Sequence, residues 1–301
     1  MRGKFEGCLL GLALGDALGA IGIGETATSI QQKYGQIKDL LGGGKLNLDP
    51  GEYTDESQMM VSVLESICTR HCFDPDNIAY RFVGWYKSRP KDISSFTSHV
   101  LKRMLEGERW QEASEGAAYD STLEIAGSVS LVYGIPVGLY RYLNTNKLSE
   151  DSITCSRITH WDERCTHGSM IVNYAISLLV RDEPKIFDKV FEFAHDKNRE
   201  LVEALVKVQE LKIENLNTSD YAPTTLQAAF WILLNSQSLE GGLIRAANLG
   251  GAAPNAVAAL AGAMLGAKFG RVAIPDSWLY KLIGRDRVEV LASRLYELSI
   301  L

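Results

Sequence analysis

Apolar residues recur at helical spacing along almost the whole chain, and this pattern predicts an all-α protein. From Asp55 onward the apolar positions follow a 3.6-residue period as far as Ile67. The same spacing predicts further helices at Thr28–Tyr34, Asp76–Lys87, Ser94–Glu106, Ile135–Leu143, Trp161–Arg181, Glu183–His195, Arg199–Leu211, Pro223–Asn235, Ser238–Asn248 and Arg285–Leu298. Alternating β-branched residues are nearly absent, and the best candidate for a strand is Ser128–Val132.

Glycine at strict four-residue spacing distinguishes two of the apolar segments. The first segment carries Gly3, Gly7, Gly11, Gly15 and Gly19, and Ala253–Gly270 repeats the spacing at Ala258, Gly262, Gly266 and Gly270. On a helix this spacing lines one side with small residues, although each interior glycine costs about 0.5–1 kcal/mol relative to alanine. We therefore expect the two glycine rows to pack on each other, which would bring Asp16 near the turn at Gly250–Asn255.

Composition and charge limit the classes of protein to which this chain can belong. The 301 residues are 46% hydrophobic and 23% charged, with no linker-like stretch, so we expect one domain over residues 1–301. The net charge of -6 offers no basic patch for nucleic acid. Five scattered cysteines favour a reducing compartment, and we expect a cytoplasmic protein. The apolar run Cys8–Ile21 is short for a bilayer and interrupted by Asp16, so no membrane association is expected.

Thr54, Asp55 and Glu56 place a hydroxyl and two carboxylates in consecutive positions, where a turn gives way to a long helix. Two interpretations are open. Thr54 or Asp55 caps the helix and Glu56 complements its dipole. Alternatively, the three oxygen-bearing side chains bind a hard divalent cation such as Mg²⁺ or Ca²⁺. The same residues can serve both purposes.

Histidine offers one further candidate. His160 and His167 are seven residues apart, so a helix would place them on one face. His160 lies at a predicted helix start, where its ring either faces a cleft or caps the helix toward solvent. Gly42–Gly44 lacks the Lys-Ser/Thr pair of a phosphate-binding loop, and no G-x-S-x-G segment is present.

Several of these features occur together in one order along the chain. Gly7–Gly19 (GCLLGLALGDALG) is followed by Tyr53–Met59 (YTDESQM), then Thr159-His160, then Leu249-Gly250-Gly251 before an Ala/Gly-rich helix. This arrangement resembles the ADP-ribosylglycohydrolase family over nearly the whole chain. The resemblance implies a compact orthogonal bundle of helices around a dinuclear Mg²⁺ (sometimes Mn²⁺) site. It also implies cleavage of the N- or O-glycosidic bond that joins ADP-ribose to a protein or small-molecule acceptor.

The chain departs from the family pattern at several functional segments. Thr54 and Asp55 match the first metal-binding turn, and Glu56 replaces its second Asp. The second turn, an Asp-x-Asp-Ser/Thr motif in the family, falls on Ala253, Pro254, Asn255 and Ala256; an alternative alignment puts Ala252 and Pro254 at the acidic positions. Ile23 stands where many members carry a Glu, with Glu25 nearby, and the central Gly-Asn-Gly segment is altered to Gly127-Ser128-Val129.

The resemblance, corrected for these departures, implies a reduced site. Its metal ligands are Thr54, Asp55 and Glu56, with Asp55 and Glu56 also catalytic, and it holds at most one Mg²⁺ or Mn²⁺ ion. Contacts to the substrate are expected from His160, Ser128, Gly251 and Asn255, and Asp16 could add a carboxylate. Two functions are open: a divergent ADP-ribosyl hydrolase, or an inactive member that binds ADP-ribose or a nucleotide or has a structural role.

Overall fold

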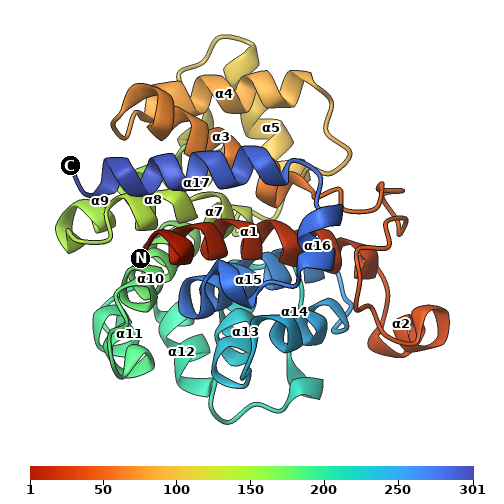
Figure 1. Cartoon of the computed structure of the whole chain (residues 1–301). Helices are drawn as coiled ribbons and strands as arrows, with labels where there is room; N and C mark the ends of the chain where they lie inside the picture. Colours follow the sequence, from red (N-terminus) through yellow and green to blue (C-terminus); the bar gives the residue numbers. More distant parts are fainter.

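The protein, described by a computed structural model over residues 1–301, is built from helices joined by loops (Figure 1). The α-helices are α1 Arg2–Gly19, α2 Ala27–Tyr34, α3 Asp55–Arg70, α4 Pro75–Lys87, α5 Ser95–Leu105, α6 Trp110–Asp120, α7 Val129–Tyr133, α8 Ile135–Tyr140, α9 Thr145–Arg157, α10 Glu163–Val180, α11 Ile186–Ala194, α12 Arg199–Lys207, α13 Ala222–Leu234, α14 Leu239–Ala247, α15 Pro254–Phe269, α16 Asp276–Lys281 and α17 Arg285–Ser299. Extended pairing is limited to three isolated bridges. The all-α prediction is confirmed.

The helices predicted from periodicity are present with shifted ends, whereas three were missed and one segment was wrongly interpreted. The missed helices are α6, α9 and α16. Helix α9 is rich in Ser, Thr and charged residues, and it begins where the Asn144 side chain accepts a hydrogen bond from Lys147 N–H. The strand candidate Ser128–Val132 is wrong, because Val129–Tyr133 forms a short helix buried on all sides. Burial on every face removes the periodicity that separates helix from strand.

Helices α1 and α15 form an antiparallel pair at the centre of the molecule (Figure 1). Gly11 lies against Gly262, and a Cβ at Gly7 would stand 2.5 Å from the carbonyl carbon of Gly270. A Cβ at Gly266 would overlap the carbonyl oxygen of Gly7. The two backbones therefore touch through positions that accept no side chain, and the predicted packing of the glycine rows is confirmed.

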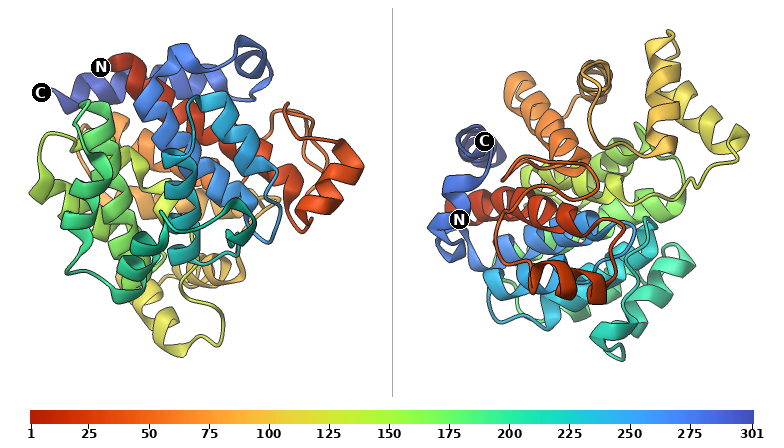
Figure 2. Two further views of the ribbon diagram at one scale, coloured as in Figure 1. Left: turned by 90° about the horizontal axis from the view of Figure 1, so that it is seen from below. Right: turned by 90° about the vertical axis from the view of Figure 1, so that its right-hand side faces the viewer.

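The other helices surround this pair in two groups. Helices α3, α4, α5 and α17 lie on one side of α1, and α10 to α14 lie on the other (Figure 1). One hydrophobic cluster of 74 buried residues connects both groups. Helices α5 and α6 project from the body (Figure 2) and share a small cluster of their own, formed by Phe96, Val100, Ala113 and Ala117.

The N-terminal apolar helix is longer than the sequence interpretation allowed. Arg2–Gly22 is long and apolar enough to cross a membrane by length and composition, with a mean hydropathy of 1.4. However, 94% of that window is buried inside the protein. A central helix that is apolar all round is expected where neighbouring helices cover every face.

Candidate functional site

The carboxylate of Asp16, on α1, caps the first turn of α3. Its Oδ1 accepts a hydrogen bond from the Thr54 hydroxyl at 2.6 Å. Its Oδ2 accepts from the backbone N–H groups of Thr54 and Ser57, both at 3.0 Å, and from the Ser57 hydroxyl at 2.6 Å. Thr54 is the N-cap residue by position, as predicted, but its side chain makes no capping bond to the helix. The capping group comes instead from a helix far away in sequence.

This arrangement explains how Thr54 is held. Its hydroxyl donates to Asp16 and accepts from Asn255 Nδ2 at 3.1 Å. Asp16 is fully buried, and burial raises the pKa of its carboxyl to about 6 against the lowering effect of its hydrogen bonds. Both oxygens of Asp16 are occupied by donors, so Asp16 orients Thr54 rather than facing the neighbouring cavity.

That cavity has a volume of about 180 Å³ and is strongly acidic. Four carboxylates and a single lysine line it, together with Ser94, Asn255 and apolar residues; the charged members are Asp55, Glu56, Asp92, Asp220 and Lys45. Asp55 and Glu56 come from the first turn of α3, whereas Asp92 precedes α5 and Asp220 precedes α13. Three segments distant in sequence thus bring like charges to one cavity.

Only Lys45 compensates the charge of the four carboxylates in this cavity. Asp55 and Glu56 are only 6% and 4% exposed. Burial, followed by neighbouring carboxylates, raises the pKa of both well above the ordinary range. The Oε2 atom of Glu56 is buried and has no hydrogen-bond partner. Burial and Asp220 also raise the pKa of Asp92, against the effect of Lys45. Such a set of oxygen donors fits a hard cation.

The four carboxylates of the cavity do not form a single cluster of metal ligands. No three His, Cys, Asp or Glu side chains are grouped as ligands of a single ion. The four carboxylates share the cavity without converging on one point. The donor chemistry fits a divalent cation. Asp55 and Glu56 are the two carboxylates that lie next to each other, on the first turn of α3.

The second turn faces the same cavity, as the sequence predicted, but contributes little charge. Ala252, Ala253 and Asn255 lie on the cavity wall. Gly251, expected to contact substrate, is not on that wall. It adopts a φ of 109°, and its N–H and C=O bond the backbone of Glu25 and Gly24 at 2.7 Å. Gly251 therefore holds the turn in place.

Ile23 also lines the cavity at the position where the family pattern has a Glu. Glu25 does not replace it, because its carboxylate bonds Ser29 and Lys33 on the outside of the molecule. The wall at Ile23 is therefore apolar, and the remaining acidic groups are those of Asp55, Glu56, Asp92 and Asp220.

His160 and Ser128 lie next to the cavity rather than on its wall. The backbone N–H and the hydroxyl of Ser128 both donate to Asp220 Oδ1, at 2.9 and 2.7 Å. His160 is completely buried behind Gly127, where a Cβ would stand 3.3 Å from its Nε2. Its Nδ1 pairs with the Thr159 hydroxyl at 2.8 Å, and Nε2 has no partner.

The expectation that one helix carries His160 and His167 is wrong. His160 belongs to the connection before α10, whereas His167 lies within α10, where its Nδ1 accepts the N–H of Asn198 at 3.2 Å. The predicted helix start at Trp161 was placed two residues early, because Asp162 is the residue that caps α10. The two rings therefore form no joint site.

Sequence reasoning missed Asp92 and Asp220. Both lie in connections just ahead of a helix, where an acidic residue is a routine feature. Neither shares a periodic pattern with Asp55 and Glu56, so nothing in the sequence distinguishes them from surface carboxylates. Only the fold brings these loops to the first turn of α3.

Fold and cavity together define an all-α protein with a buried acidic site at the N-terminus of α3. The chain belongs to the ADP-ribosylglycohydrolase family, whose model matches residues 1–300. It is 28% identical to the ADP-ribosylarginine hydrolase Tri1 of Serratia proteamaculans, over 98% of this chain and 80% of that protein. It is 30% identical to the ADP-ribosyl-[dinitrogen reductase] glycohydrolase of Rhodospirillum rubrum, over 92% and 89% respectively.

A solved structure agrees with these relatives. An ADP-ribosylglycohydrolase-related protein complex contains a chain that superposes with a TM-score of 0.81 at 28% identity, covering 99% of this chain and 98% of that one. The resemblance drawn from the motifs and the helical fold that it implied are both confirmed. The departures from the family motifs that the sequence indicated lie in or beside the cavity, at Ile23, Glu56, Gly127–Val129 and Ala253–Ala256.

Proposed function

We propose that this protein hydrolyses the glycosidic bond between ADP-ribose and an acceptor, which is an ADP-ribosylated protein or small molecule. Family membership and relatives named as ADP-ribosyl hydrolases support this reaction class. The observation that carries the proposal is the pair Asp55 and Glu56. These carboxylates are buried, repel each other and have no cationic side chain beside them on α3.

Retaining such a pair costs stability, because buried charges without partners are unfavourable. An inactive family member would gain stability by losing either carboxylate, whereas a hydrolase needs them. The acidic cavity therefore favours the enzyme over the inactive alternative. The second turn carries no carboxylate at Ala253 or Asn255, so the two carboxylates of the first turn are the more informative feature.

The cofactor that fits is a single Mg²⁺ or Mn²⁺ ion. Thr54, Asp55 and Glu56 are the residues that we expect to hold it. Asp55, Glu56, Asp92 and Asp220 line the cavity, whereas Thr54 is not on its wall and its hydroxyl is bonded to Asp16 and Asn255. When bound, such an ion would orient the ribose hydroxyls and the attacking water and would stabilise charge that develops during hydrolysis. One ion is the limit, because only one turn keeps adjacent carboxylates.

The remaining roles belong to side chains in the cavity and directly beside it. Glu56 Oε2, which has no partner in the protein, accepts a proton from the attacking water. Asn255 fixes the hydroxyl of Thr54, and Ser128 fixes Asp220 from the opposite wall. His160 supports the Gly127 segment from behind, since its ring is shielded from the cavity by that backbone. The apolar Ile23 limits access of further water.

The experiment that tests the proposal measures release of ADP-ribose from ADP-ribosylated arginine, serine and protein substrates with Mg²⁺ or Mn²⁺ present. Asp55→Asn and Glu56→Gln should each reduce kcat by at least about 100-fold, the usual scale for a lost acid-base group. Glu52→Gln is the matched control, because Glu52 lies outside the cavity and pairs with Lys91. Turnover on none of the substrates, or full activity in Asp55→Asn and Glu56→Gln, would reject the proposal.

A further inference from the structure

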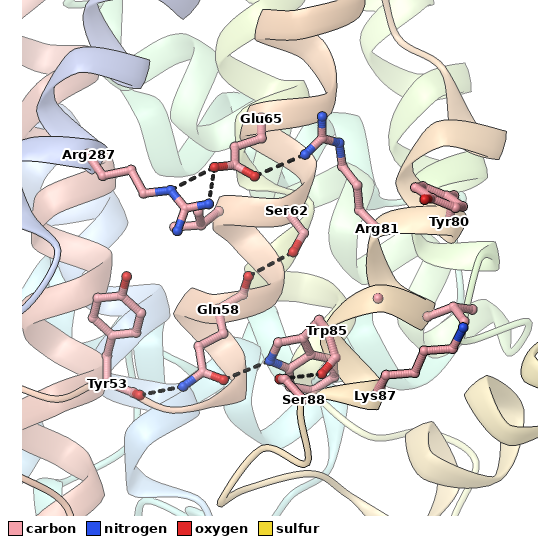
Figure 3. Close-up of a pocket in the computed structure, with 13 residues that line it drawn as sticks. Tyr53, Gln58, Ser62, Glu65, Tyr80, Arg81, Trp85, Lys87, Ser88 and Arg287 are labelled. Carbon is pink, nitrogen blue, oxygen red and sulfur yellow. Dashed lines mark hydrogen bonds and ion pairs between the residues drawn. The ribbon is translucent and has the colours of Figure 1, made fainter.

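A second and larger hollow lies on the other face of α3, between α3, α4 and α17 (Figure 3). Its volume is about 720 Å³, and it shares no lining residue with the acidic cavity. The floor comes from α3 through Gln58, Ser62 and Glu65, and one wall comes from α4 through Arg81 and Trp85. We call this hollow the α3–α4 groove. Its size falls within the range of small-molecule sites.

The α3–α4 groove is basic, in a protein whose net charge is -6. Arg81, Lys87 and Arg287 line it, against the single carboxylate of Glu65. Glu65 joins the two arginines: Oε2 accepts from Arg81 at 3.0 Å, and Oε1 accepts from Nε of Arg287 at 2.7 Å. One carboxylate thus fixes two guanidinium groups and leaves an excess of positive charge.

Free hydrogen-bond donors point into the α3–α4 groove. Arg287 bonds Glu65 through Nε and Nη2, which leaves both N–H groups of Nη1 unpaired. The hydroxyl of Tyr53 has no hydrogen-bond partner and is directed toward Arg287 (Figure 3). A guanidinium edge beside a hydroxyl is a donor arrangement that suits phosphate oxygens.

Tyr53 is held in position by a short chain of hydrogen bonds (Figure 3). The indole N–H of Trp85 donates to Gln58 Oε1 at 2.7 Å, and Gln58 Nε2 donates to the carbonyl of Tyr53 at 3.1 Å. These bonds tie α4, α3 and the turn before α3 together. The groove is therefore shaped before any ligand arrives, which lowers the entropic cost of binding.

Gly84 gives an independent indication that something occupies the α3–α4 groove. It lies inside α4, its φ is not positive, and a Cβ there would meet no atom within 4 Å. A glycine inside a helix costs about 0.5–1 kcal/mol relative to alanine. Neither packing nor backbone conformation within this chain requires it. Its effect is to keep the wall beside Trp85 flat and open.

We propose that the α3–α4 groove binds a phosphate ester of nucleotide size. The phosphate contacts Arg287 Nη1 and the Tyr53 hydroxyl, and a flat ring lies over Gly84 beside Trp85. Arg81 holds Glu65 from the other side and keeps Arg287 in place. This site is distinct from the acidic cavity, and the proposal does not depend on the hydrolase activity.

Calorimetric titration of the whole protein with AMP and with inorganic phosphate tests the proposal. One saturable AMP site is expected, with AMP bound at least about tenfold more tightly than phosphate. Arg287→Gln and Gly84→Leu should each weaken AMP binding by at least about tenfold. Gly84→Leu should also leave the melting temperature unchanged or higher, because leucine favours a helix, so its effect on binding cannot come from unfolding.

Two control variants locate the site. Arg2→Gln removes an arginine that pairs with Glu297 outside the groove, and Asp55→Asn alters the acidic cavity. AMP binding should be the same in both as in the wild type. The proposal is overturned by absence of saturable AMP binding, by AMP affinity equal to that of phosphate, by unchanged binding in Arg287→Gln and Gly84→Leu, or by loss of binding in Asp55→Asn.

Discussion

At the scale of single residues, the carboxylate of Asp16 links two helices that meet at the site. It accepts four hydrogen bonds, two from Thr54 and two from Ser57. The amide of an asparagine would offer one acceptor oxygen in place of two. At least one buried donor on α3 would then lose its partner, so Asp16 sets the position of the turn that carries Asp55 and Glu56.

We therefore expect Asp16→Asn to lower the free energy of unfolding by about 2–5 kcal/mol, since each unsatisfied buried donor costs about 1–3 kcal/mol. Urea unfolding followed by circular dichroism measures the change. Ser57→Ala is the control: it removes one hydroxyl bond and should cost only about 1 kcal/mol. Equal stabilities of Asp16→Asn and the wild type would show that this carboxylate does not organise the turn.

The burial of His160 leads to a second prediction at the scale of residues, on how the free energy of unfolding depends on pH. Burial lowers the pKa of His160 from 6.5 to about 4, with Asp220 opposing the shift. Above pH 6.5 the ring is neutral in both folded and unfolded chains and contributes nothing. Between pH 6.5 and 4 only the unfolded chain binds the proton, so the free energy of unfolding falls as the pH falls, by up to about 3 kcal/mol.

Denaturant unfolding at pH 7, 6 and 5 measures this dependence. In His160→Gln the contribution of this ring is absent, so the wild type should lose stability relative to the variant as the pH is lowered through this range. Parallel stability curves for the two proteins would contradict a buried, neutral His160.

At the scale of elements, the contact between α1 and α15 is the feature that side-chain size controls most directly. A Cβ at Gly266 would overlap the carbonyl oxygen of Gly7, whereas a Cβ at Gly3 would meet nothing within 4 Å. Substitution by alanine should therefore change the free energy of unfolding in opposite directions at these two glycines.

Gly266→Ala should lower the free energy of unfolding by about 1–3 kcal/mol or more, because two backbones must separate to admit the methyl group. Gly3→Ala, in the same helix pair, should raise it by about 0.5–1 kcal/mol through the entropy of the unfolded chain. Thermal and urea unfolding of both variants measure the difference. A neutral Gly266→Ala would mean that the helices are further apart than described.

Some helices could be predicted from the sequence and others could not. Amphipathic helices such as α4 and α17 were predictable, because one polar face preserves the 3.6-residue period. Helix α7 was not, because burial on every side erases that period. The glycine rows predicted the α1–α15 pair, since no other explanation covers nine small residues at one spacing.

The residues of the candidate site likewise fall into those that were predictable from the sequence and those that were not. Thr54, Asp55, Glu56 and the turn at Asn255 were predictable from motif order, and all of these except Thr54 lie on the cavity wall. Asp92 and Asp220 were not predictable, because loop residues reach a site through the fold and leave no periodic trace. The capping role of Asp16 depended likewise on the contact between helices.

At the scale of the whole molecule, α3 separates two regions of opposite charge. Its first turn faces the acidic cavity through Asp55 and Glu56, and its middle faces the basic α3–α4 groove through Ser62 and Glu65. The acidic side should respond to divalent cations through the stability of the entire fold, because a ligand that binds only the folded state stabilises it.

Mg²⁺ or Mn²⁺ at 100 times its dissociation constant should add about 2.7 kcal/mol to the free energy of unfolding. The melting temperature should therefore rise by several degrees, measured by differential scanning calorimetry. Asp55→Asn should melt higher than the wild type without metal, since repulsion in the cavity is relieved, and should show little further rise with metal. Asp92→Asn and Asp220→Asn should show a reduced rise. A metal-induced rise in Asp55→Asn equal to that of the wild type would place the ion elsewhere.

The antiparallel contact of α1 with α15 also has a consequence for how the chain is made. Helix α1 leaves the ribosome well before its partner α15, because more than 200 residues separate the two along the chain. At about 5–20 residues per second, roughly 10–50 s pass between the two. During that interval an almost wholly apolar helix lacks the surface that covers its glycine row, so the newly made chain depends on chaperones or on rapid collapse until α15 has been made.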